Sequence, residues 1–215
     1  LITIEIEDVN VEALEILQKE GVSVCPDPRV LKIIQDKGIQ KKFYVDNDIP
    51  TSPYKLINGA SEISPADLPI VQKLRVGGYD GRGVQVLRTE EDLSRAFNEP
   101  SVLEELVSIQ KELAVIVARN ANGETKAFPV VELVFNQEAN LVEYLFSPAS
   151  IDELTAHKAE SLALSVAQAL DLEGILAVEM FLNTDGKLLV NESAPRTHNS
   201  GHHTIEGNYT SQFAQ

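Results

Sequence analysis

Residues 190–203, which read VNESAPRTHNSGHH, concentrate side chains that can do chemistry. Asn191 and Glu192 come first, and they offer the oxygen ligands that a hard cation such as magnesium takes. The loop after them adds an arginine, which can hold phosphate through a bidentate fork. A solvated loop of ordinary turn residues is the alternative, but this concentration of Arg and His in an acidic chain favours a site for an anionic, hydroxylated ligand. The loop residues in question are Arg196, His198, Asn199 and Ser200.

Glu179 is the single charged residue in the apolar run 174–182, GILAVEMFL. A carboxylate in a core strand is costly to bury unless it is paired or binds a metal. The turn NTDG that follows predicts a hairpin, which would bring Glu192 close to Glu179. Since neighbouring carboxylates repel each other unless a cation lies between them, the pattern predicts a magnesium site at Glu179 and Glu192, with Asn191 beside them. An ion pair with a nearby lysine or arginine is the alternative.

Residues 76–84, VGGYDGRGV, form a glycine-rich segment between two predicted strands. Its backbone N–H groups can wrap a phosphate, although a plain mobile turn is as good an interpretation. The segment lacks the Gly-Lys-Ser/Thr ending of a P-loop and does not open a helix, which excludes a dinucleotide fingerprint as well. Lys73, alone among apolar residues of the preceding strand, favours phosphate binding.

Glu104 and Glu105 precede the apolar pair Leu106 and Val107 in a predicted strand. The two carboxylates could take the ribose hydroxyls or the adenine amino group of a nucleotide, while the backbone near Leu106 reads the base edge. A charge pair on an edge strand is the alternative.

The elements that must position these residues follow from hydrophobic periodicity and turn residues. Helices are predicted over 11–19, 29–46 with a break at Gly38, 89–97, 151–170, and from Thr204 onward. Strands are predicted over 1–6, 22–25, 54–57, 68–74, 84–87, 101–107, 111–119, 125–135, 141–146, 174–182 and 187–192. The four strands between 101 and 146 predict an antiparallel meander. Lys41 and Lys42 are expected on a solvated basic face of the second helix.

The amino-acid composition limits which partners the protein can have and which cellular compartment suits it. The chain has 215 residues and a formal net charge of −15, which argues against a nucleic-acid backbone or an anionic membrane as the main partner. One cysteine excludes an internal disulfide and suits a reducing compartment. No apolar run is long enough to cross a membrane. The chain does not begin with Met and starts as if a strand were already under way, so we expect a piece of a longer protein.

These features together resemble the ATP-grasp superfamily. Five phrases resemble its 5-(carboxyamino)imidazole ribonucleotide synthetases: IIQDK (33–37), KLRVGGYDGRG (73–83), VEMF (178–181), NESAPRTHNSGHHT (191–204) and SQF (211–213). The resemblance implies an α/β (α+β) ATP-grasp fold of two lobes with antiparallel sheets. Residues 1–27 would end a Rossmann-like N-terminal domain and residues 28–215 form the ATP-grasp domain, with a small lobe at about 50–100 and a large lobe at about 101–215. The C-terminal domain of the family would be absent.

The resemblance also implies the activity. Members use ATP, Mg²⁺ and bicarbonate to carboxylate 5-aminoimidazole ribonucleotide through carboxyphosphate in purine biosynthesis. Two Mg²⁺ ions fit the site and Mn²⁺ can substitute. The expected setting is a cytoplasmic homodimer with small-molecule substrates, and neither nucleic acid nor membrane as a partner. Another ATP-grasp ligase and a nucleotide-binding fragment without turnover are the alternatives.

Site residues carry over from the resemblance by position. The nucleotide contacts implied are Lys37, Lys73, Gly78, Tyr79, Asp80, Gly81, Arg82, Gly83, Val84, Glu104, Glu105, Leu106, Val107, Glu112, Asn191 and Glu192. Glu179 and Glu192 match the metal ligands. The pocket for ribonucleotide and bicarbonate matches Tyr79, Asp80, Arg82, Arg196, His198, Asn199 and Ser200, of which Asp80, Arg82, Arg196 and His198 are expected to be catalytic. One departure is Phe135, which stands where some members have a histidine.

Overall fold

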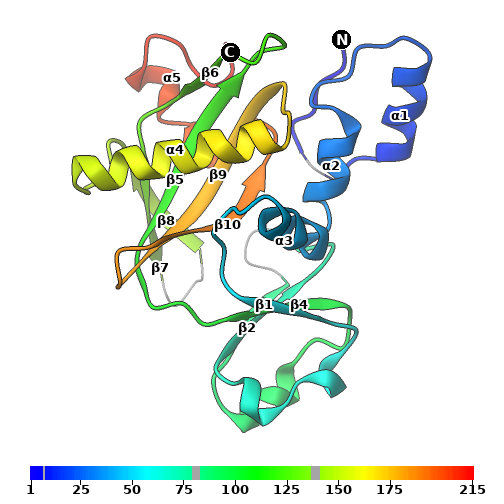
Figure 1. Cartoon of the computed structure of the whole chain (residues 1–215), viewed down its shortest axis with the longest axis vertical. Coiled ribbons are helices and arrows are strands. Elements are labelled where there is room, and N and C mark those ends of the chain that lie inside the picture. The colour runs from blue at the N-terminus through cyan, green and yellow to red at the C-terminus, as the bar shows by residue number, and fades with distance from the viewer. Residues whose placement is uncertain (7, 79–82, 137–140) are drawn as a thin grey trace.

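Two antiparallel sheets organise the chain, one at each end of the molecule (Figure 1). The computed structural model describes residues 1–6, 8–78, 83–136 and 141–215. The larger sheet has six strands in the order β10-β9-β5-β7-β8, with β6 paired to β5. Their bounds are β5 Ile109–Arg119, β6 Thr125–Ala127, β7 Val131–Asn136, β8 Leu141–Phe146, β9 Gly174–Asn183 and β10 Leu188–Ala194. The predicted strand 125–135 is therefore two strands, because Pro129 between them has no N–H to donate to a ladder.

Helix α4, Glu153–Ala169, lies across one face of this sheet (Figure 1). Asp152 caps it by accepting a hydrogen bond from the Thr155 N–H. The sheet-facing stripe is made of small side chains, which lets the helix approach closely; its fully buried members are Ala159, Ala163, Val166 and Ala167. Leu154, predicted in this stripe, is 64% exposed, because nine residues, about two and a half turns, separate it from Ala163.

The smaller sheet contains β1 Tyr54–Ile57, β2 Ile70–Leu74, β3 Val84–Leu87 and β4 Ser101–Glu105, in the order β1-β4-β2-β3. The predicted hairpin of β2 and β3 is confirmed, with Lys73 opposite Val84. The predicted meander is wrong for its first strand, because β4 lies between β1 and β2 instead of pairing with β5. Four consecutive residues of β4 are buried, as in a central strand covered on both faces. The small lobe thus extends beyond residue 100.

Three helices precede the sheets: α1 Val11–Lys19, α2 Pro28–Ile34 and α3 Lys37–Asp46. Asn10 caps α1 as predicted, through the Ala13 N–H. The break expected at Gly38 comes two residues earlier, because the Asp36 carboxylate accepts from the N–H groups of Gly38 and Ile39 and starts α3. None of the helices in the described part of the chain combines the length and apolar character that a membrane crossing requires.

Some predicted elements are shorter than expected. The predicted strand 1–6 reduces to one parallel bridge between Ile2 and Val24, because no neighbouring strand extends the ladder. The predicted helix 89–97 is a 3₁₀ segment, Glu90–Arg95, closed by a capping box of Thr89 and Asp92. Helix α5 is one turn, Thr204–Gly207, and does not continue to the chain end. The remaining 3₁₀ segments are Ala60–Glu62, Pro65–Asp67 and Asn199–Gly201.

The main core lies between α4, the large sheet and helices α2 and α3. Alternate residues of β9 divide between two environments, as the period of a strand requires. Val178 and Met180 pack in the core, whereas Glu179 and Phe181 face a cleft. Tyr44 of α3 is fully buried in the same core. The apolar pattern of β9 therefore fixes which side its lone carboxylate faces.

Overpacking the contact between α4 and the sheet should destabilise the fold. We expect Ala163→Leu to lower the free energy of unfolding by about 1–3 kcal/mol, because a fully buried alanine leaves no room for three more carbons. Chemical denaturation measures the change. Leu154→Ala on the same helix is the control and should change stability by less than about 0.5 kcal/mol. Equal stability of Ala163→Leu and the unmodified protein would contradict the close packing.

Candidate active site

A cleft of about 1050 Å³ lies between the two sheets. Its walls include β2 and β3 of the small sheet and β5, β7, β8, β9 and β10 of the large sheet. Among the described residues that line it are predicted site residues from distant parts of the chain: Lys73, Val84, Leu106, Val107, Glu112, Glu179, Asn191, Glu192, His198 and Asn199. Phe135 lines it as well. The fold thus gathers most of the described candidates around one cavity of a size that suits a small ligand.

Glu179 and Glu192 are opposite each other across β9 and β10, as predicted from the hairpin. The register shifts between Val190 and Glu192, so that Asn191 is the extra residue of a β-bulge. Both residues after Val190 reach lysines: Asn191 Oδ1 accepts from Lys73 Nζ at 2.7 Å, and Glu192 Oε2 from Lys37 Nζ at 2.5 Å. The bulge therefore aims two consecutive polar side chains at positive charges on the wall of the cleft.

The electrostatics of the two carboxylates differ. Burial raises the pKa of Glu179 well above its usual range, and the charges of Glu192 and Glu112 add to the effect. Lys37 holds the pKa of Glu192 below its usual range despite burial. An ionised Glu179 therefore needs a further positive charge, and two carboxylate groups with an amide oxygen beside them are donors of the type that Mg²⁺ takes. Within the described residues, no group of three or more His, Cys, Asp or Glu residues is placed to hold a metal.

Lys73 is held by a second carboxylate. Glu104 Oε1 lies 2.9 Å from Lys73 Nζ, and Glu104 Oε2 lies 3.1 Å from Lys41 Nζ. Glu104 is 3% exposed and lies behind the cleft wall, and its predicted contact with ribose or adenine stays a prediction. Lys41 is 2% exposed, so the predicted solvated face is wrong for it, whereas Lys42 pairs with Asp46 on the surface as expected.

Part of the cleft lining is apolar. Leu106, Val107 and Phe135 line the cleft together with Glu112, whose pKa burial raises to about 7, with partial compensation by Lys73. Glu132 also lines the cleft and pairs with Lys111 at 2.6 Å. Apolar surface with a few polar groups suits a flat base and the hydroxyls of a sugar. Glu105 is exposed, and its predicted contact stays a prediction.

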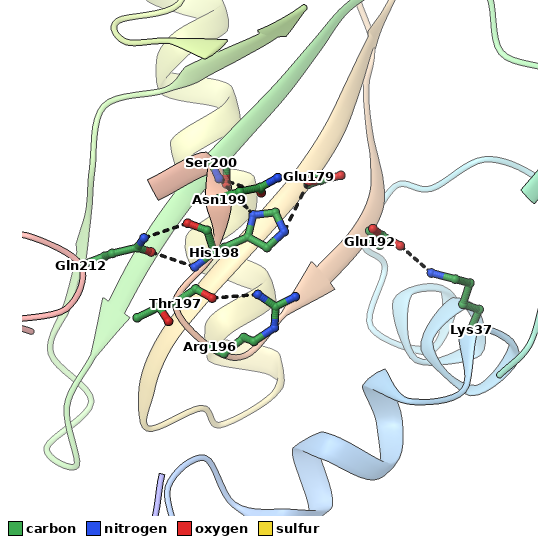
Figure 2. Close-up of polar contacts among 9 residues, drawn as sticks. All are labelled: Lys37, Glu179, Glu192, Arg196, Thr197, His198, Asn199, Ser200 and Gln212. Atoms are coloured by element: carbon green, nitrogen blue, oxygen red, sulfur yellow. Dashed lines mark hydrogen bonds and ion pairs between the residues drawn. The ribbon is translucent and has the colours of Figure 1, made fainter. Parts of the chain in front are cut away.

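The loop after β10 presents His198 to Glu179. Figure 2 shows the imidazole pointing toward the carboxylate, with 3.7 Å between His198 Nε2 and Glu179 Oε1. His198 Nδ1 lies 2.8 Å from Ser200 Oγ. Ser200 is fully buried and supports the ring from behind, and its predicted contact with substrate stays a prediction. Asn199 lines the cleft, and the Arg196 guanidinium donates to the Thr197 carbonyl at 2.8 Å.

Gln212 fixes the backbone of His198 from the side away from the cleft (Figure 2). Its Oε1 accepts from the His198 N–H at 3.0 Å, and its Nε2 donates to the His198 carbonyl at 2.7 Å. Gln212 is 1% exposed, and its own N–H donates to Thr204 Oγ1 at 2.9 Å. A glutamine fourteen residues after His198 carries no pattern by itself; only the SQF phrase of the family resemblance indicated it.

The structure describes the two ends of the glycine-rich segment, residues 76–78 and 83–84. Gly83 has φ +75°, and a Cβ there would lie 3.1 Å from the Gly78 Cα, so the two ends of the loop approach closely. Val84 follows in β3 and lines the cleft. The predicted contacts at Tyr79, Asp80, Gly81 and Arg82 lie outside the described residues.

Sequence reasoning missed Lys41, although a signal existed. Lys37 and Lys41 are four residues apart and therefore share one face of α3, which meets the carboxylates of the cleft wall. Lys42 is one residue further on, about 100° around the helix, and reaches solvent. The predicted phosphate lysine Lys37 thus pointed to Lys41 as a partner on the same face.

Neutralising Glu112 should remove a pH-dependent loss of folding stability. Its pKa is about 7 in the folded protein and ordinary in the unfolded chain, so between the two values the folded state binds more protons and stability falls as pH rises. We expect the stability advantage of Glu112→Gln to grow from pH 4.5 to 7 and to reach about 2 kcal/mol. Denaturation curves across this range measure it, with Glu105→Gln as the control for loss of one charge. Equal pH slopes for both variants would contradict the assignment.

Filling the space at Gly201 should loosen His198. An alanine Cβ there would lie 2.3 Å from Gln212 Oε1, so Gln212 must leave the His198 backbone. We expect Gly201→Ala to cost about 1–3 kcal/mol of stability and to shift the imidazole NMR signals of His198. Gly207→Ala is the control, because no atom lies within 4 Å of its Cβ position. Unchanged His198 signals in Gly201→Ala would overturn the positioning role of Gln212.

Comparison with known proteins agrees with this geometry. The chain is 40% identical over 223 residues to a chloroplastic phosphoribosylaminoimidazole carboxylase of Vigna aconitifolia, covering all of this chain and 40% of that protein. It is 38% identical to an N5-carboxyaminoimidazole ribonucleotide synthase of Bacillus subtilis, covering all of this chain and 58% of the relative.

A solved structure is similar throughout. It is an Aspergillus clavatus N5-carboxyaminoimidazole synthase in complex with ADP and 5-aminoimidazole ribonucleotide, with TM-score 0.88 and 31% identity. The match covers all of this chain and 57% of that one. The chain thus spans about 40–60% of the length of these proteins. The ATP-grasp domain model matches residues 42–213, and the chain belongs to the ATP-grasp family.

Proposed function

We propose that this chain provides the ATP-grasp domain for the ATP-dependent carboxylation of 5-aminoimidazole ribonucleotide with bicarbonate, in purine biosynthesis. One observation carries the proposal: Glu179 and Glu192 face each other beside Lys37 and Lys73 on the wall of a cleft between two antiparallel sheets. The relatives support the substrate, since one is an N5-carboxyaminoimidazole ribonucleotide synthase by name and another, an N5-carboxyaminoimidazole synthase, is in complex with ADP and 5-aminoimidazole ribonucleotide.

ATP would lie along the cleft. The adenine would occupy the apolar part at Leu106, Val107 and Phe135, and Glu112 would accept from the ribose hydroxyls. The triphosphate would reach toward Lys73 and Lys37. Lysine ammonium groups act there as point charges that attract phosphate oxygens.

Glu179 and Glu192, with the Asn191 amide oxygen beside them, would hold Mg²⁺. When bound, the metal neutralises negative charge on the phosphate oxygens. The residues fit this role, because two carboxylates and an amide oxygen line the same cleft on paired strands, and burial together with the neighbouring carboxylates raises the pKa of Glu179. Lys37 already balances the charge of Glu192 and can hold that carboxylate in place.

The chemistry is a phosphoryl transfer followed by an acyl transfer. A bicarbonate oxygen attacks the γ-phosphorus of ATP, the bond to the β–γ bridging oxygen breaks, and ADP leaves. The exocyclic amine then forms a bond to the carboxyl carbon of carboxyphosphate, phosphate leaves, and the amine nitrogen loses a proton. Arg196 and His198, on the loop at the metal end of the cleft, would hold the anionic ribonucleotide and bicarbonate in line with the γ-phosphate.

The proposal extends to the setting of the protein. A cytoplasmic homodimer is implied by the family resemblance, and a reducing compartment is consistent with a single cysteine in the chain. Sedimentation of the purified protein tests the dimer directly.

Glu192→Ala should abolish substrate-stimulated ADP formation. We expect ADP release with ATP, Mg²⁺ and bicarbonate to rise on adding 5-aminoimidazole ribonucleotide, and the variant to lose about a hundredfold or more of this rate, because a metal ligand and the partner of Lys37 disappear together. A coupled ADP assay measures it, on the 215-residue chain and on any longer chain that contains it.

Glu91→Ala, an exposed carboxylate outside the cleft lining, is the control and should retain the full rate. ADP formation that is indifferent to the ribonucleotide would leave the ATP-grasp domain in place and refute the purine substrate. Nucleotide binding without any turnover would indicate a binding fragment.

A further inference from the structure

A closed ring of polar contacts lies behind the phosphate end of the cleft and joins α3, β2, β4 and β10. Lys41 Nζ donates to Thr51 Oγ1 at 2.7 Å, and Thr51 Oγ1 donates to the Val190 carbonyl at 2.7 Å. The ring continues through Glu104 and Lys73 to Asn191, the residue next to Val190. The proposed reaction gives no role to Lys41, Glu104 or Thr51, and Lys41 is the one lysine among them.

Only one of the three charged members reaches the cleft. The side chains of Lys41 and Glu104 are each 3% exposed, whereas the Lys73 side chain is 10% exposed and lines the cavity. Lys41 thus cannot touch a ligand in the cleft. Its contacts are the Glu104 carboxylate and the Thr51 hydroxyl, both on the inner side of the wall.

The charge of Lys41 affects how strongly Lys73 can attract a phosphate group. Glu104 paired with Lys73 alone would form a neutral pair, and Lys73 would offer little net attraction to phosphate. Glu104 instead pairs with both Lys41 and Lys73, so these three side chains together carry one net positive charge. Lys73 is the member of this trio that lines the cleft, so the net charge acts on a ligand there through Lys73. Charges interact strongly in such surroundings, since little water separates them.

The titration behaviour is consistent with a charged trio near neutral pH. Burial lowers the pKa of Lys41 to about 8, with Lys73 and Lys37 adding to the effect and Glu104 opposing it. Glu104 keeps a pKa below its usual range despite burial, because of Lys73 and Lys41.

We propose that Lys41 is a positioning residue that shares the Glu104 carboxylate and thereby keeps the charge of Lys73 available for the phosphate groups of the nucleotide. The inference rests on the proposed nucleotide site and adds a residue to it that touches no ligand. It predicts that affinity for phosphate groups follows the net charge of the trio. Removal of Lys41 takes that charge to zero, and removal of Lys41 together with the charge of Glu104 restores it.

The test compares MgADP and adenosine binding by calorimetry in four proteins: unmodified, Lys41→Met, the double variant Lys41→Met/Glu104→Gln, and Lys42→Met. We expect Lys41→Met to weaken MgADP about tenfold while leaving adenosine within about twofold. The double variant should return MgADP to within about threefold of the unmodified protein. Lys42→Met controls for the loss of a lysine from the same helix, since Lys42 is paired with Asp46 on the surface, and it should bind as the unmodified protein does.

Several outcomes would overturn the inference. A purely structural Lys41 would weaken MgADP and adenosine together, and the second substitution would not rescue binding. Lys41→Met leaves Glu104 partly uncompensated, and this variant can fail to fold for that reason. In that case the double variant alone is the test, and a loss of more than tenfold in its MgADP affinity refutes the charge-sharing role. An unmodified protein that binds neither ligand would refute the nucleotide site itself, and the inference with it.

Discussion

Two carboxylates from neighbouring core strands face each other at the wall of the cleft, and the surrounding elements supply the positive charge that this arrangement requires. Glu179 is opposite Glu192 in the ladder, so strand pairing holds the backbones of the two residues side by side. Lys37 comes from the first turn of α3 and Lys73 from β2 of the small sheet. Helix α3 and the small sheet are therefore tied to the large sheet by the same charges that an anionic ligand and its cation will meet.

The bulge at Asn191 decides which side chains meet those lysines. A strand alternates its side chains, so a regular ladder would send Asn191 and Glu192 to opposite faces of the sheet. The extra residue brings both to positions where they contact Lys73 and Lys37. The bulge is one irregularity in the antiparallel pair of β9 and β10. Because of it, the amide of Asn191 and the carboxylate of Glu192 can both face the cleft.

Sequence patterns predicted the parts of the site that lie on strands, and the physical reason is periodicity. Glu179 interrupts an apolar run, and the NTDG turn sets the partner strand, so the opposition to Glu192 followed from local signals. The placement of β4 did not, because a strand's pattern reports burial on its faces and not which strands lie on its edges. Gln212 and Lys41 were missed for different reasons. Gln212 has no local pattern that distinguishes it from a surface residue, because it acts through the backbone of His198. Lys41 shares a helix face with Lys37, but its buried partner Glu104 lies far away in the chain.

The balance of buried charge explains why this wall suits a nucleotide and a divalent cation together. Three lysines, Lys37, Lys41 and Lys73, meet three carboxylates, Glu104, Glu179 and Glu192. The wall is neutral when all are ionised and positive when Glu179 keeps its proton, as its raised pKa favours without a metal. In the proposed function, a divalent cation at Glu179 and Glu192 would replace that proton and leave the wall with a surplus of positive charge, which would match the negative charge of a triphosphate. The phosphate and the metal would then stabilise each other's binding.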